Sequence, residues 1–126
     1  AVLVMAYFMG LKYDDKLNGT PDYIISRRSS LGKRVLEYPL LVAVEAKKND
    51  FEQGWAQCLA ELIAAQKLNQ DENLVVYGIV SDGKYWEFGK LQEQQFTKNR
   101  SSFAIDKLSD LFGALDFILT EASLSA

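Results

Sequence analysis

The sequence contains no histidine and a single cysteine, Cys58. The absence of histidine excludes Ser-His-Asp and Cys-His catalysis, histidine general acids and histidine-ligated metal sites. One cysteine excludes an internal disulfide and any zinc site that needs several cysteine ligands. Because its neighbours include the apolar residues Ala56, Leu59 and Leu62, we interpret Cys58 as a small core residue rather than a nucleophile. Any chemistry of this chain must therefore come from carboxylates, amines or bound ions.

Proline and long apolar runs are also scarce. The 2 prolines each precede an apolar run, and no repeat or low-complexity tract divides the 126 residues, so we expect one domain over residues 1–126. The longest apolar stretch, Ala1 to Met9, is much shorter than the roughly 18 residues of a membrane span, which favours a soluble, cytoplasmic protein. The chain opens on Ala rather than Met, and we expect that the start of its first helix is missing.

Neither sign of charge dominates the chain. The formal net charge is −3, so whole-molecule electrostatics do not indicate nucleic-acid binding. Basic residues nevertheless cluster within residues 27–34, 47–48 and 98–100. Both a local basic patch and an ordinary solvated surface fit these clusters.

The periodicity of apolar residues predicts an alternation of helices and strands. We interpret residues 1–9 as the end of a buried helix, with a buried strand as the alternative. Asp50 and Gln53 resemble a capping box, and the helical spacing after them predicts a helix to about Lys67. The other predicted elements are strands over 22–26, 40–47, 74–80 and 84–91, a hairpin turn at Ser81-Asp82-Gly83, and a last helix from about Asp106 with Leu108, Leu111, Phe112, Leu115, Ile118 and Leu119 on one face. This order predicts an α/β sandwich with a central mixed sheet flanked by helices.

The second predicted strand ends in a carboxylate and an amine. Alternation along this strand puts Leu41, Ala43, Glu45 and Lys47 on one face. An acid and an amine at the end of a buried strand are costly to place there without partners, which makes Glu45 and Lys47 candidates for function. If the strand that begins at Asp22 pairs with this one, Asp22 approaches Glu45.

Two carboxylates held close together repel each other unless a cation lies between them. A hard divalent ion, Mg²⁺ above all, takes oxygen ligands and resolves that conflict. Such an ion polarises a phosphodiester and activates water, while Lys47 could orient the water or stabilise charge on the phosphorus. Asp22, Glu45 and Lys47 therefore fit phosphodiester hydrolysis without histidine. The simpler interpretation is an ordinary surface pair of Glu45 and Lys47 on an unrelated α/β interaction domain.

The residues around this set resemble a known family. Pro21-Asp22 followed by Glu45-Ala46-Lys47 is similar to the catalytic hairpin of the PD-(D/E)xK nuclease superfamily, which has the restriction-endonuclease-like fold. Gln57 falls where many members carry a glutamine on the helix after the motif. The segment from Val76 to Phe88 is similar to the strand-turn-strand of nuclease domains in type I restriction subunits. The resemblance covers roughly residues 3–91.

The resemblance implies a role for each motif residue. Asp22 and Glu45 would bind Mg²⁺ or Mn²⁺ with help from the backbone carbonyl of Ala46. Lys47 would act on water or phosphate, and Gln57 would support it. On a helical wheel Gln57 either faces solvent or points toward Lys47, depending on which helix face packs on the sheet.

The resemblance also implies a DNA-cleaving endonuclease that pairs as a homodimer or joins a larger restriction or defence assembly. We expect no membrane association, because the apolar stretches are too short to span a membrane. The chain departs from the family at one point. Many members supply an acidic residue from the first helix, yet no Asp or Glu precedes Asp14 here. The alternative is a catalytically inactive nuclease-fold module that serves in nucleic-acid binding or protein assembly.

Overall fold

The computed structural model describes residues 3–7, 11–12, 18–19, 23–27, 37–47 and 50–124. Strands and two helices alternate through these ranges. They are β1 (Leu3–Tyr7), β2 (Leu11–Lys12), β3 (Asn18–Gly19), β4 (Tyr23–Arg27), β5 (Glu37–Ala46), α1 (Phe51–Asn69), β6 (Val76–Ser81), β7 (Tyr85–Gln92), β8 (Gln95–Lys98), β9 (Phe103–Ala104) and α2 (Leu108–Leu124).

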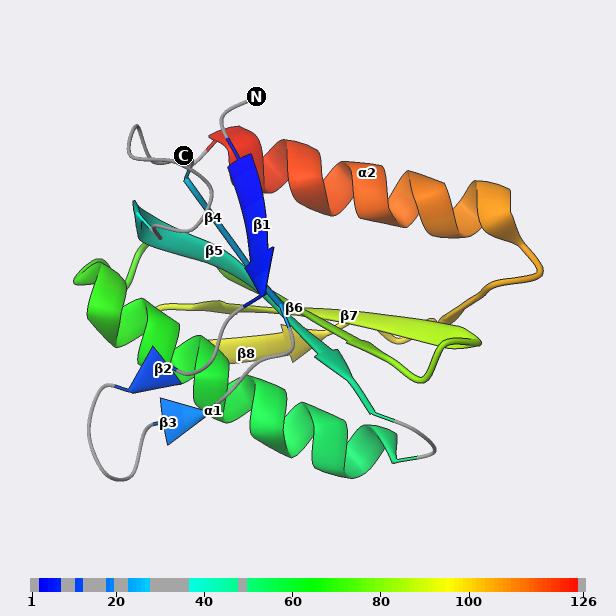
Figure 1. Ribbon diagram of the computed structural model, residues 1–126, viewed down its shortest axis with the longest axis horizontal. Coiled ribbons are helices and arrows are strands. Elements are labelled where there is room, and N and C mark those ends of the chain that lie inside the picture. Colours follow the sequence, from blue (N-terminus) through cyan, green and yellow to red (C-terminus); the bar gives the residue numbers. More distant parts are fainter. Residues whose placement is uncertain are drawn as a thin grey trace.

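A seven-stranded mixed sheet forms the middle of the molecule, with the order β1-β4-β5-β6-β7-β8 and with β9 paired to β7. β1, β4 and β5 pair antiparallel, whereas β5 and β6 are parallel and are joined through α1. β7 returns antiparallel to β6. β2 and β3 form a separate short hairpin that lies beside α1 (Figure 1). The predicted α/β class with a mixed sheet is confirmed.

The sheet lies between the two helices, α1 on one face and α2 on the other (Figure 1). Two buried apolar clusters correspond to these faces. Ile24, Ala43 and Val80 pack with residues of α1, whereas Ile25, Val42 and Ile79 pack with residues of α2. Neighbours in each strand thus alternate between the clusters, as the two-residue period of a strand requires.

The predicted cap of α1 is present. The Asp50 side chain accepts a hydrogen bond from the Gln53 N–H at 2.9 Å, which satisfies one of the free donors of the first turn. The helix runs two residues past the predicted Lys67, and Gln70 follows it in the left-handed conformation with φ 57°. The element on which Gln57 lies therefore begins where the local signals predict.

A bulge interrupts β5 at Leu41. Ile25 pairs with Val42 and Ser26 pairs with Leu40, so Leu41 is the extra residue. Leu41 and Val42 both pack in the cluster on the α2 side, while Leu40 and Ala43 pack on the α1 side. The prediction that Leu41 shares a face with Ala43 is wrong, because simple alternation does not hold across a bulge.

The first predicted helix is also wrong, because Leu3–Tyr7 is a strand, β1, paired with β4. An apolar run without polar interruptions shows neither the helical nor the strand period, so the sequence does not distinguish a buried strand from a buried helix here. The pairing with β4 makes this segment a strand. The segment after β7 was not predicted to be regular, yet it forms β8 and β9. The β7–β8 turn has no glycine or asparagine; Glu93, at φ 57°, is held by a 2.6 Å hydrogen bond from its N–H to the Glu72 carbonyl.

α2 begins two residues after the predicted Asp106 and packs through a narrower face than predicted. Leu111, Ile118 and Ala122 are buried, whereas Leu108, Phe112 and Leu119 lie on the flank and are partly exposed to solvent. Neither helix in the described part of the chain is long and apolar enough to cross a membrane.

Candidate functional site

Glu45 lies one residue before the end of β5, on the face of the sheet that α1 covers. Its Cα partner on β6 is Val80, and only 2% of the residue is exposed. Burial raises the pKa of the neighbouring Cys58 thiol on α1, and the charges of Glu61 and Glu45 raise it further. A carboxylate is therefore held under α1 at the end of a central strand.

Lys47 follows directly after β5 and lies against α1. Its backbone N–H donates to the Ser81 carbonyl at 2.8 Å, which continues the β5–β6 pairing past the end of the strand. Its Nζ is 3.5 Å from Gln57 Oε1. Of the two orientations considered for Gln57, the structure has the one that points toward Lys47, with Gln57 half-buried.

The other two predicted site residues contribute less to the described geometry. Ala46 lies between Glu45 and Lys47 at the end of β5, with Ser81 as its Cα partner. Asp22 lies outside the described residues, as does Pro21.

Glu61 is a buried carboxylate that the sequence did not single out. It lies on α1 one turn after Gln57 and is fully buried. The charge of Glu61, like that of Glu45, raises the pKa of the Cys58 thiol, so both carboxylates lie near Cys58 between α1 and the sheet. A sequence signal for it exists, because Glu61 interrupts the apolar face formed by Cys58, Leu62 and Ala65 at helical spacing.

Oxygen donors at this end of β5 would suit a hard divalent ion. Within residues 3–124, leaving out the gaps between the described ranges, no group of three or more His, Cys, Asp or Glu side chains has the arrangement of a metal site. The described residues contribute the Glu45 carboxylate and the Ala46 carbonyl to the predicted ligand set, and a further carboxylate has to come from Asp22.

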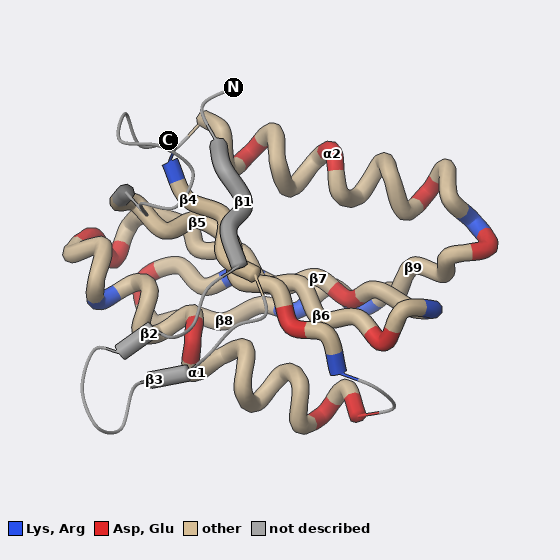
Figure 2. The backbone as a smooth tube through the Cα atoms, in the orientation of Figure 1, with Lys and Arg blue, Asp and Glu red and all other residues tan. Residues whose placement is uncertain are grey.

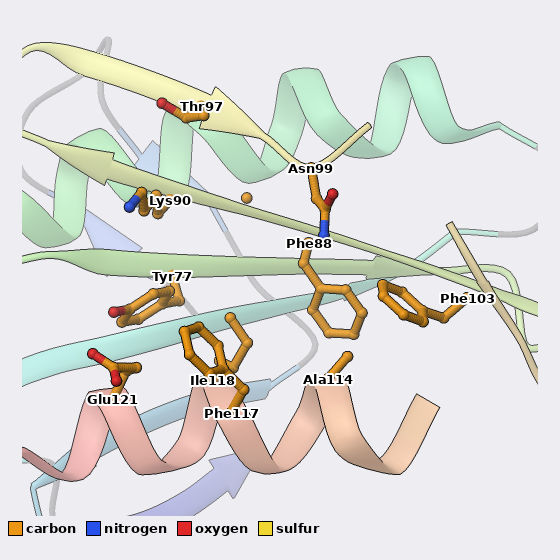
Figure 3. Close-up of a pocket in the computed structure, with 11 residues that line it drawn as sticks. Tyr77, Phe88, Lys90, Thr97, Asn99, Phe103, Ala114, Phe117, Ile118 and Glu121 are labelled. Atoms are coloured by element: carbon orange, nitrogen blue, oxygen red, sulfur yellow. The ribbon is translucent and has the colours of Figure 1, made fainter. Parts of the chain in front are cut away.

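A groove of about 390 Å³ opens on the other face of the sheet, between α2 and strands β6 to β8 (Figure 3). Phe88 and Phe103 meet there edge to face with ring centroids 5.5 Å apart. Tyr77 and Glu121 lie toward one end, and burial together with the Glu121 charge raises the pKa of the Tyr77 hydroxyl. The sheet separates this groove from the end of β5 that carries the acid and the amine.

A second groove, of about 410 Å³, flanks α1 on the side of β7 and β8. Trp55 Nε1 donates to Glu87 Oε1 at 2.7 Å, and Lys98 Nζ is 3.5 Å from the same oxygen. Lys98 Nζ also lies 5.8 Å from the centroid of the Trp55 ring. Trp55, Glu87 and Lys98, which line this groove, therefore interact with one another.

Charge is distributed without a single basic face in the part of the chain that is described. Basic positions are interspersed with acidic ones along the backbone, and the few charged residues of α2 are all acidic (Figure 2). Of the predicted basic clusters, Arg27, Lys98 and Arg100 are exposed, while Arg28, Lys33, Arg34 and Lys48 lie outside the described residues.

Comparison with known proteins adds no family to these observations. No protein-family model, curated protein or solved structure matches this chain. The class of protein therefore has to be inferred from the order of its strands and helices and from the contacts of Glu45, Lys47 and Gln57.

Proposed function

We propose that this protein is a metal-dependent deoxyribonuclease with a restriction-endonuclease-like fold. One observation carries the proposal: Glu45 is buried under α1 at the end of β5, and Lys47, two residues on, has its Nζ 3.5 Å from Gln57 Oε1. A buried acid and an amine held by an amide at one strand end form an arrangement that ordinary surface pairs do not require.

The order of elements supports the fold part of the proposal. The β4–β5 antiparallel pair carries the motif strand, α1 follows it with Gln57, and β6–β7 forms the next strand-turn-strand. This is the order that the resemblance to the PD-(D/E)xK superfamily implies. The position of the mixed sheet between α1 and α2 agrees with it (Figure 1).

The residue types fit Mg²⁺ or Mn²⁺, because Glu45, the Ala46 carbonyl and Asp22 offer only oxygen. Asp22 immediately precedes Tyr23 in the chain, and Tyr23 pairs with Val44, the residue before Glu45. An antiparallel register that continued by one residue would bring the two carboxylates to one face of the hairpin. When bound, such an ion polarises the phosphodiester and lowers the pKa of an attacking water.

Lys47 acts on the substrate, and Gln57 and α1 hold Lys47 and Glu45 in place. The Lys47 ammonium offers hydrogen bonds and a positive charge to a phosphate oxygen, where charge grows during hydrolysis. Gln57 restricts the direction of that ammonium by accepting one of its hydrogen bonds. α1 covers Glu45 and keeps bulk water from the carboxylate, which strengthens its electrostatic interactions.

The test is cleavage of supercoiled, linear and single-stranded DNA in Mg²⁺, Mn²⁺ or EDTA. Glu45→Gln and Lys47→Ala should each lower the metal-dependent rate by at least about a hundredfold while the circular dichroism spectrum stays unchanged. Glu52→Gln and Lys90→Ala are matched controls, because both residues are exposed and Lys90 lies on a strand away from β5. They should cleave like the wild type.

Cleavage that survives both Glu45→Gln and Lys47→Ala would refute the proposal. DNA binding without cleavage by the wild type would instead leave the alternative, an inactive nuclease-fold module for nucleic-acid binding or protein assembly. The expected homodimer or larger restriction or defence assembly stays a prediction.

A further inference from the structure

Gly54 is a point of very close contact between α1 and the ends of β5 and β6. The residue is buried and faces the sheet. A Cβ atom at Gly54 would lie 2.8 Å from Val80 Cγ1 and 3.3 Å from Lys47 Cβ. The first distance is shorter than real Cβ atoms adopt, and the second is tighter than most. Any side chain here would displace Lys47, Val80 or the helix.

The same part of α1 contacts Lys47 at two points. The Cβ position of Gly54 is 3.3 Å from Lys47 Cβ and 3.7 Å from Lys47 Cγ, so the backbone of α1 lies against the lysine stem. Gln57 Oε1 is 3.5 Å from the Nζ at the tip. Because residues three apart are neighbours on a helix, Gly54 and Gln57 act on the stem and the tip of one side chain. This contact along its length restricts an otherwise flexible lysine.

We infer that Gly54 is a positioning residue for Lys47. Without a side chain at this position, the lysine stem lies directly against α1 and its ammonium reaches Gln57. The inference rests on the proposed function, because it concerns the placement of the proposed catalytic lysine. Glycine is a poor residue for a helix interior, so α1 gives up helix stability at this position.

A purely structural explanation also exists, since close packing of α1 on Val80 would require glycine by itself. The two explanations are separable because Val80 and Lys47 are different contacts of the same position. Val80→Ala removes the Cγ1 atom that lies 2.8 Å from a Gly54 Cβ, but it leaves the contact with the lysine stem. The decisive variant is therefore Gly54→Ala combined with Val80→Ala.

The experiment compares the double variant with Val80→Ala alone. Gly54→Ala alone is expected to lose stability through the Val80 contact, which is why the double variant carries the test. Gly113→Ala is the matched control, since Gly113 lies in α2 and a Cβ there meets nothing within 4 Å. The readouts are the ¹⁵N NMR signals of the Lys47 ammonium and the Gln57 side-chain amide, the urea midpoint, and cleavage of supercoiled DNA with Mg²⁺.

The expected result is a urea midpoint of the double variant no lower than that of Val80→Ala, because alanine is the better helix former, with the Lys47 and Gln57 signals shifted. Cleavage should be at least about tenfold slower than in Val80→Ala, because small displacements of a reacting group are costly. Gly113→Ala should leave the signals and the cleavage rate unchanged. Lys47 and Gln57 signals that coincide in the double variant and in Val80→Ala would overturn the inference.

The two proposals fail in distinguishable ways. Shifted signals in the double variant, with no cleavage by the wild type, would keep the positioning role of Gly54 and reject the nuclease function. Coincident signals with equal cleavage rates would keep the nuclease function and reject the positioning role.

Discussion

Asn69, the last residue of α1, holds the irregular start of β5 through two hydrogen bonds. Its Oδ1 accepts from the Leu40 N–H at 2.7 Å, and its Nδ2 donates to the Leu40 carbonyl at 2.8 Å. Leu40 is 2% exposed and directly precedes the bulge at Leu41. The side-chain amide thus supplies the donor and the acceptor that a neighbouring strand would otherwise supply.

We predict that Asn69→Ala destabilises the protein by about 2–3 kcal/mol. A buried donor or acceptor that loses its partner costs about 1–3 kcal/mol, and Leu40 presents one of each. Losing the partner of the Leu40 carbonyl costs less free energy than losing the partner of its N–H, because the carbonyl oxygen has a second lone pair for another donor. Alanine is a better helix former than asparagine by up to about 0.7 kcal/mol, which offsets part of the loss.

The measurement is urea denaturation followed by tryptophan fluorescence, with the loss read from the midpoint at an unchanged slope. Asn69→Asp keeps an acceptor for the Leu40 N–H but sets a carboxylate oxygen against the Leu40 carbonyl, so it should be no more stable than Asn69→Ala. Asn73→Ala is the matched control, because the Asn73 side chain is exposed and makes no hydrogen bond to the described residues. A change of less than about 0.5 kcal/mol in Asn69→Ala, the range of ordinary surface substitutions, would refute the reasoning.

Three further predictions concern single side chains. Trp55→Phe keeps a ring in the core but removes the N–H that donates to Glu87 at 2.7 Å; it should cost about 1–2 kcal/mol in urea unfolding, and an unchanged midpoint would contradict it. Because burial raises the pKa of the Cys58 thiol, a disulfide reagent at about pH 8 should label it only after unfolding, so rapid labelling of the native protein would exclude the buried position. Two backbone N–H groups of the β6–β7 turn lower the pKa of Asp82 from its ordinary value of 3.8. The Asp82 carboxylate therefore stabilises the fold at a pH above 3.8, and this stabilisation is lost as the pH falls through the lower pKa of the folded state. The stability advantage of the wild type over Asp82→Asn should shrink between about pH 5 and about pH 2, and an advantage independent of pH would contradict this.

The sequence predicted correctly those elements whose ends are formed by side chains close to them in sequence. The cap of α1 depends on Asp50 and Gln53, which are three residues apart. The β6–β7 turn depends on Asp82, whose Oδ1 accepts from the Lys84 and Tyr85 N–H groups, and on Gly83 at φ 95°. Each of these contacts lies within a few residues of sequence, so the sequence pattern alone predicts them.

Contacts between distant segments decided what the pattern missed. β1 is a strand because β4 pairs with it, and the β7–β8 turn is held by Glu72 and Gln66, both far from Glu93 in sequence. In the candidate site, Glu45 and Lys47 were predicted from alternation. The sequence does not fix the direction of Gln57, because this direction depends on how α1 packs on the sheet, and that packing includes the close approach of α1 to β5 and β6 at Gly54.

The bulge at Leu41 decides which face of the sheet carries the candidate site. Because side chains alternate along a strand, one extra residue reverses the face of everything after it. Leu40 lies on the α1 face, so a regular strand from that point would put Ala43, Glu45 and Lys47 on the α2 face. The bulge returns them to the α1 face, where Gln57 meets Lys47. Since Asn69 holds the backbone of Leu40 beside the bulge, the far end of α1 helps to set the face on which the acid and the amine lie. A loss of stability in Asn69→Ala is therefore expected to be accompanied by disturbed Lys47 and Gln57 side-chain NMR signals, although Lys47 precedes α1 and Gln57 lies in its first half.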